Sequence, residues 1–140
     1  MTYQPAIYRE QGAKRLVVTT GGKIIHTLSV NNVAARHNTL SVAQIVAGIV
    51  THESTTGGGN VTTDTAANII AGSSGVGALK ADGECIICYY VNTGDQILTL
   101  VDGGDVTLAN AGQTIAEHES AILLFRRTGA AAVTLYIIGA

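Results

Sequence analysis

GECIICYYVNTGDQILTLVDGGDVTL, residues 83–108, contains two apolar runs, each followed by a segment of turn-forming residues. Runs of β-branched and aromatic residues separated by Asn, Gly and Asp predict a β-hairpin with strands at 85–91 and 97–101, then a short third strand. Successive side chains of a strand point to opposite faces, and in 85–91 neither face is polar. We therefore expect both faces to be covered, one by a second sheet of the same subunit and the other by another subunit.

The two faces of the 85–91 strand define the candidate contact between subunits. Ile86, Cys88 and Tyr90 share one face, and the residues at 85, 87, 89 and 91 share the other. We expect the contact to use Ile86, Cys88 and Tyr90, or else the alternate face. Because the two thiols of the C-x-x-C string point apart, they cannot form an unstrained disulfide, and without a helix or further ligands they are expected to be inert.

Composition favours an assembly protein with a single core. The 140 residues are 46% hydrophobic and only 13% charged, below the roughly 25% usual for soluble domains, so we expect much surface to be buried between subunits. The longest apolar stretch, 40–50, is shorter than a spanning helix needs, and the polar N-terminus lacks a secretory pattern, which predicts a protein made in the cytoplasm without membrane contact. The net charge of −2 argues against nucleic acid.

The first 38 residues have a different pattern of apolar and polar residues from the rest of the chain. Two short apolar runs, 16–18 and 24–25, flank Thr-Thr-Gly-Gly and predict a two-stranded ribbon that is too small to stand alone. The leading segment 3–8 holds two tyrosines and the only proline, and is interpreted either as an arm that becomes ordered on another surface or as a frayed terminus. With 31–38 as a connector, we predict an arm at 1–38 and a β-domain at 39–140.

The β-domain is expected to contain two short helices and several short strands. One helix is capped by Thr39 or Ser41 and ends near residue 47; the other starts at 63 or 64 and runs to 70, with 67, 70 and 71 facing the core. Further strands are predicted at 106–109, 114–116, 120–127 and 132–138, the last two joined by a turn at 128–130. This pattern predicts a mainly β fold, an antiparallel β-sandwich or jelly-roll-like domain with one or two short helices and an N-terminal β-ribbon arm.

The sequence contains no complete motif for catalysis or cofactor binding. The glycine-rich loops lack the G-K-[ST] and dinucleotide patterns, and the histidines are scattered. His52 and His118 each have acidic neighbours, and a metal-dependent enzyme using either histidine is a minor alternative. We expect no catalytic residue, no metal and no cofactor.

Several stretches together resemble small head decoration proteins of tailed phages, also called cement or head-fibre proteins. Residues 8–22 resemble the opening of these proteins, with a Gly-Gly turn after a short apolar strand. Residues 61–70 resemble their internal helix, and residues 87–108 and 120–138 resemble their closing strands. The run Cys85-Ile-Ile-Cys88 departs from the usual mixture of aromatic and polar residues.

The resemblance implies a trimeric virion protein on the outer surface of an icosahedral capsid, where it clamps neighbouring copies of the major capsid protein. On that basis the β-domain forms the homotrimer and the arm binds the shell, through Tyr3, Pro5, Ile7, Tyr8 and Arg9. Similar β-heads occur in fibres, so the alternative is a head or tail fibre module that binds a host-surface glycan through loops such as 55–60.

Overall fold

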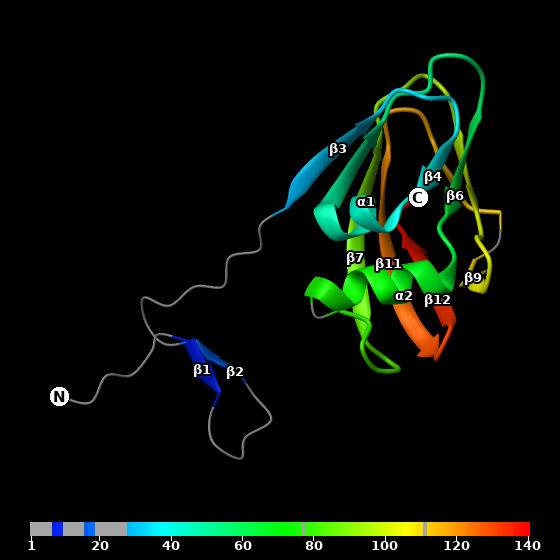
Figure 1. Cartoon of the computed structure of the whole chain (residues 1–140). Coiled ribbons are helices and arrows are strands. Elements are labelled where there is room, and N and C mark those ends of the chain that lie inside the picture. Colours follow the sequence, from blue (N-terminus) through cyan, green and yellow to red (C-terminus); the bar gives the residue numbers. More distant parts are fainter. Residues whose placement is uncertain (1–6, 10–15, 19–27, 77, 111) are drawn as a thin grey trace.

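The computed structural model describes residues 7–9, 16–18, 28–76, 78–110 and 112–140, and its fold is mainly β with two short α-helices (Figure 1). The elements are β1 (Ile7–Arg9), β2 (Leu16–Val18), β3 (Ser29–Val33), β4 (Asn38–Leu40), α1 (Val42–Ala47), β5 (Gly48–His52), β6 (Gly59–Thr63), α2 (Ala66–Ser73), a 3-10 turn η1 (Ser74–Val76), β7 (Cys85–Asn92), β8 (Leu98–Val101), β9 (Val106–Leu108), β10 (Thr114–Ile115), β11 (Ser120–Gly129) and β12 (Ala132–Ile138).

The chain winds back and forth between two sheets. Strands β3, β5 and β7 are parallel neighbours in a six-stranded sheet of order β3-β5-β7-β11-β12-β9. Strands β4, β6 and β8 are parallel neighbours in a four-stranded sheet of order β10-β8-β6-β4. Parallel neighbours need a long crossover, and here a strand of the opposite sheet supplies part of each one.

The sheets are mixed, so the expectation of an antiparallel domain is wrong in this respect. Antiparallel pairing joins β7 to β11, β11 to β12 and β8 to β10, whereas β9 lies parallel to β12. The hairpin predicted at 85–101 does not form, because β7 and β8 belong to different sheets. The hairpin predicted around 128–130 is confirmed by the pairing of β11 with β12.

Asn92 explains why the chain leaves the six-stranded sheet after β7. Its buried amide nitrogen donates hydrogen bonds to the carbonyl oxygens of Gln96 (2.7 Å), Ala116 (2.9 Å) and Ile115 (3.2 Å). Its Oδ1 accepts a bond from the Gly94 amide at 3.1 Å. One side chain therefore directs the 93–97 turn toward β10 and the four-stranded sheet.

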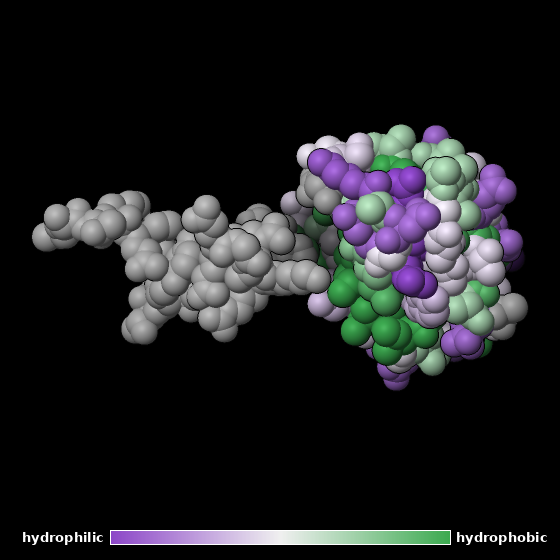
Figure 2. All heavy atoms as spheres, turned by 90° about the horizontal axis from the view of Figure 1, so that it is seen from below, coloured by the Kyte–Doolittle hydropathy of each residue, from purple (hydrophilic) through white to green (hydrophobic). Residues whose placement is uncertain are grey.

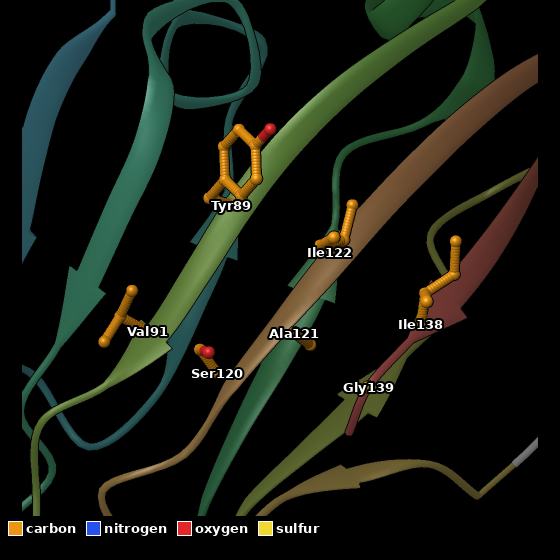
Figure 3. Close-up of a pocket in the computed structure, with 7 residues that line it drawn as sticks. All are labelled: Tyr89, Val91, Ser120, Ala121, Ile122, Ile138 and Gly139. Carbon is orange, nitrogen blue, oxygen red and sulfur yellow. The ribbon is translucent and has the colours of Figure 1, made fainter.

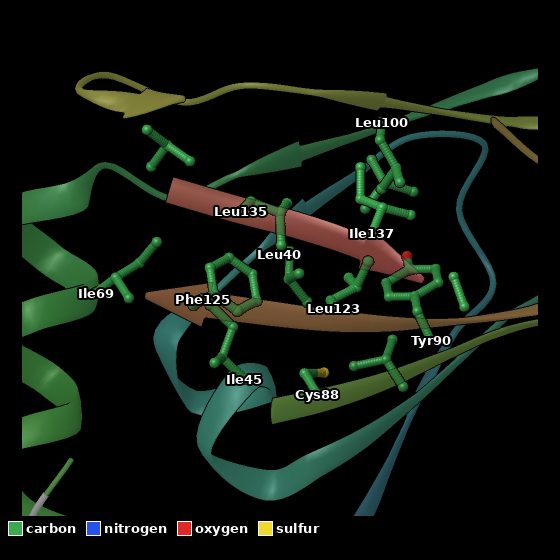
Figure 4. Packing of buried hydrophobic residues seen from close by; sticks show 14 of the residues in the cluster. Leu40, Ile45, Ile69, Cys88, Tyr90, Leu100, Leu123, Phe125, Leu135 and Ile137 are labelled. Carbon is green, nitrogen blue, oxygen red and sulfur yellow. The ribbon is translucent and has the colours of Figure 1, made fainter. Parts of the chain in front are cut away.

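Side chains from both sheets and both helices form one hydrophobic core. Figure 4 shows Leu40 and Leu100 of the four-stranded sheet, Phe125 of the six-stranded sheet, and Ile45 and Ile69 of the helices turned toward one another. All five are at most 3% exposed. Covering the inner faces of both sheets in this way supplies the main favourable term in folding.

The first helix begins where the sequence predicts. The Ser41 hydroxyl accepts a hydrogen bond from the Gln44 amide, and the Gln44 side chain accepts one from the Ser41 amide at 2.9 Å, which is a complete capping box. Gly48, at φ +93°, then ends α1 and begins β5, a strand that the sequence pattern did not predict.

The second helix starts later than expected, at N-cap Thr65, because β6 takes up residues 59–63. This shift changes the buried face: Ala66, Ile69 and Ser73 are buried, whereas Ala67 and Ala71, expected in the core, are exposed. Residues 55–60 also include the start of β6 and are not all loop.

The N-terminal part of the chain divides differently from the expected arm. Strand β1 pairs antiparallel with β2, whereas the predicted partner at 24–25 lies outside the described residues. Strand β3 lies at the edge of the six-stranded sheet, parallel to β5 (Figure 1). Residues 29–38, assigned from sequence to the arm, are therefore part of the β-domain.

The described surface is uneven in polarity. Figure 2 shows hydrophobic residues gathered on one side of the molecule, beside a mainly hydrophilic area. The large hydrophobic side chains that are most exposed come from the six-stranded sheet or its connections: Val30, Ile87, Tyr89, Ile97 and Ile138.

Candidate functional site

The outer face of the six-stranded sheet, the side turned away from the core, carries an apolar row that crosses five strands. Strand register places these five side chains next to one another, from β3 to β12: Val30, Ile49, Tyr89, Ile122 and Ile138. Residues directly opposite in a sheet have adjacent side chains, so this central row is continuous.

A second row lies beside the central row. Ile87 of β7 is opposite Leu124 of β11, which is opposite Tyr136 of β12. Of the apolar residues in the two rows, Val30 is 56% exposed, Ile138 is 52%, and Ile87 and Tyr89 are each 42%. Isolated exposed hydrophobic residues are common on proteins, whereas contiguous apolar patches are typical of interaction surfaces.

More polar rows border the apolar ones on both sides. Asn32, Thr51, Val91 and Ser120 form one border, in which the Thr51 hydroxyl donates to Asn32 Oδ1. The other border consists of Cys85, Arg126 and Thr134. Arg126 is the single charged residue in these four rows, so the outer face combines an apolar centre with a largely uncharged rim.

A hollow of about 260 Å³ opens on this face toward the end of β12 (Figure 3). The large side chains of Tyr89, Ile122 and Ile138 stand side by side on β7, β11 and β12, and the small residues Ser120 and Gly139 leave the space open. The complete lining is Tyr89, Val91, Ser120, Ala121, Ile122, Ile138 and Gly139. The hollow can accept an apolar group of modest size.

The structure shows that only one face of β7 is accessible. Cys88 and Tyr90 are fully buried in the core of their own chain, and Ile86 is half-buried against it. They are inaccessible because the four-stranded sheet and α1 cover that face. The alternate face of β7, with Cys85, Ile87, Tyr89 and Val91, is the one that remains open.

The residues expected to bind a capsid shell fall at the N-terminus. Tyr3 and Pro5 lie outside the described residues, whereas Ile7, Tyr8 and Arg9 form β1, for which the structure describes the backbone pairing. Tyr8 is opposite Val17 in that ribbon.

His52, one of the two histidines considered for metal chemistry, lies in a buried hydrogen-bond network. Its Nδ1 is 2.8 Å from the Tyr90 hydroxyl, and its Nε2 contacts the Ala35 carbonyl oxygen. A carbonyl can only accept, so Nε2 carries the proton and Nδ1 accepts from Tyr90. The Asn38 amide donates to the same hydroxyl at 3.1 Å, which joins β5 and β7 of one sheet to β4 of the other.

Burial shifts the pKa values of the groups in this part of the core. Desolvation lowers the pKa of His52, an effect partly opposed by the Ala35 carbonyl and reinforced by His37. Desolvation also raises the pKa of Tyr90, and it raises that of the Cys88 thiol to about 12. These groups are therefore neutral near pH 7, and the network has a structural role.

His118, the other histidine considered for metal chemistry, lies apart from His52 on the surface, and Arg127 has a structural role. The Nε2 atom of His118 lies 3.1 Å from Asp95 Oδ1, and both side chains are exposed. Arg127 donates to the carbonyl oxygens of Leu79 (3.0 Å) and Lys80 (2.8 Å), so it holds a loop in place. Within the described part of the chain, no three His, Cys, Asp or Glu side chains are grouped so that they could hold a metal ion.

Comparison with protein-family models, with curated proteins and with solved structures found no significant match to this chain. Among the described residues, no helix has the length and apolar character required to cross a membrane.

The sequence predicted only part of the outer face. The sequence pattern indicated that the 85–91 strand is apolar on both faces, but Val30 was assigned to the arm at 1–38, and Ile49 lies after the predicted end of the first helix. Their contribution depends on the pairing of β3 with β5, which sequence periodicity does not specify.

Proposed function

We propose that this chain is a structural virion protein, a homotrimeric decoration or cement protein that binds the outside of a phage capsid and stabilises contacts between copies of the major capsid protein. The observation that carries the proposal is the apolar outer face of the six-stranded sheet, which needs a partner to remove it from water. The resemblance of four stretches to tailed-phage decoration proteins supplies the biological context.

In this proposal the β-domain and the N-terminal segment have separate tasks. The two sheets form a β-sandwich whose outer face makes the trimer, and the segment around β1 and β2 binds the shell, with Tyr3, Pro5, Ile7, Tyr8 and Arg9 as contacts. A three-fold assembly presents three binding segments at once, so a weak individual contact becomes strong through effective concentration. The role is structural and requires no catalytic group.

The first test is the mass of the full chain by size-exclusion chromatography with light scattering, which we expect to equal three chains of 14.4 kDa. Co-sedimentation with capsids assembled without the protein then measures attachment. Deletion of 1–11 should abolish co-sedimentation and leave the trimer intact, whereas the control Lys80→Ala, on the exposed surface of the β-domain, should change neither. Failure of the full chain to bind capsids, with saturable binding to host-cell glycans, would favour the fibre module instead.

A further inference from the structure

We propose that the outer face is covered by a second copy of this chain, and that the β3 end of the central row of one copy packs into the hollow near the β12 end of the next. The inference rests on the proposed homotrimer and names its interface. It concerns Val30 on one subunit and the hollow beside Tyr89 and Ile138 on its neighbour.

The charge of the outer face fits a copy of itself better than a charged partner. Arg126, in a border row, is the single charged residue among the four rows. Two such faces can therefore pack together without burying an unpaired carboxylate or ammonium group, which would be strongly unfavourable. A partner with a densely charged surface would lose the hydration of its charges and find no counter-charge here.

The exposed area is also of the right order. A large side chain offers roughly 150–250 Å² in total, so Val30, Ile87, Tyr89 and Ile138, at 42–56% exposed, together offer on the order of 300 Å² of largely apolar surface. This matches the larger patches on monomers that serve a function. With the border rows added, the face has the apolar centre and more polar rim that are typical of protein interfaces.

The shape of the central row suits a ring. The row crosses five strands, so its ends are about 19 Å apart at a strand spacing near 4.8 Å. The two most exposed members, Val30 and Ile138, lie at opposite ends. A closed trimer joins two different parts of the same surface, and here a projecting valine on an edge strand and a hollow of about 260 Å³ are available.

Cysteine cross-linking tests this arrangement directly. In a Cys85→Ser background, the pair Val30→Cys and Ile138→Cys is treated with a short bis-maleimide and separated on a denaturing gel. We expect a covalent trimer. A ladder that stops at the dimer would overturn the three-fold arrangement. A yield no higher than that of the control pair Val30→Cys and Thr39→Cys, with position 39 on the four-stranded sheet, would overturn the interface.

A charge placed in the face provides a second readout. Ile138→Glu at the open end of β12 should weaken self-association by more than about tenfold, because three carboxylates would be buried without partners. Tyr89→Glu at the centre should do the same, and Thr39→Glu, outside the face, should not. Unchanged self-association of Ile138→Glu, in a protein with unaltered circular dichroism, would contradict the proposal.

The two proposals fail in different ways. A wild-type chain that binds capsids but stays monomeric in solution and gives no cross-linked trimer would refute the interface and leave the decoration function standing. A trimer that cross-links through positions 30 and 138 but never binds capsids would establish the interface and refute the function.

Discussion

The Tyr90 hydroxyl lies 2.8 Å from Nδ1 of His52, and both side chains are fully buried. Tyr90 also receives a hydrogen bond from Asn38 of the four-stranded sheet, so this pair connects the two sheets at the centre of the molecule. The rings meet edge to face, with centroids 5.9 Å apart. A polar connection placed inside an apolar core makes stability sensitive to pH and to loss of a single hydroxyl.

Acidification is expected to destabilise the fold through His52. Burial lowers the pKa of this histidine in the native state, whereas the unfolded chain keeps a value near 6.5. Near and below pH 6.5 the unfolded chain therefore binds more protons at His52 than the folded chain does. The contribution of neutral His52 to stability is complete above about pH 6.5 and declines as the pH drops toward the native pKa. Thermal unfolding between pH 7.5 and 5 measures the effect. His52→Gln should flatten this slope.

Tyr90→Phe is expected to reduce the free energy of unfolding by about 1 to 3 kcal/mol, because His52 Nδ1 and the Asn38 amide would lose their shared partner inside the protein. Urea denaturation measures this cost. Thr39→Val is the control, since this exposed residue lies on the four-stranded sheet outside the outer face, and a change within about 0.5 kcal/mol is expected. Equal effects of the two substitutions would show that the buried network contributes little.

The two cysteines should differ in reactivity although they are only three residues apart. Cys85 is exposed, whereas Cys88 is buried and the pKa of its thiol is raised to about 12. Thiolate is the reactive form, so a thiol reagent at pH 8 should modify one cysteine per native chain and two in denaturant. In Cys85→Ser the native chain should not react, and rapid labelling of that variant would mean that the core opens at β7.

Gly59→Ala is expected to cost about 2 to 3 kcal/mol of stability. A Cβ at this position would collide with the carbonyl oxygen of Arg36, which is backbone and cannot rotate away. The control is Gly75→Ala, where an added Cβ meets nothing within 4 Å. Denaturant midpoints of the two variants give the comparison, and a similar midpoint for both would place the 34–37 loop farther from β6 than described.

Local patterns were sufficient for most of the elements. Ser41 and Gln44 mark the start of α1 because a capping box uses neighbours in the chain. The strands β7, β11 and β12 follow from runs of β-branched and aromatic residues, and the 128–130 turn from its glycine. The apolar character of both faces of β7 also follows from alternation alone.

Only the tertiary structure decided which strands are neighbours and therefore which face of β7 is open. The turn after Asn92 looks like a hairpin in sequence, but the Asn92 amide binds carbonyls near β10, and the chain crosses to the other sheet. Pairing between distant segments brings Val30 beside Ile49 and Tyr89 beside Ile122, and so creates the outer apolar face. Alternation along a strand determines which side chains share a face, but the partners of that face depend on contacts between residues far apart in the chain.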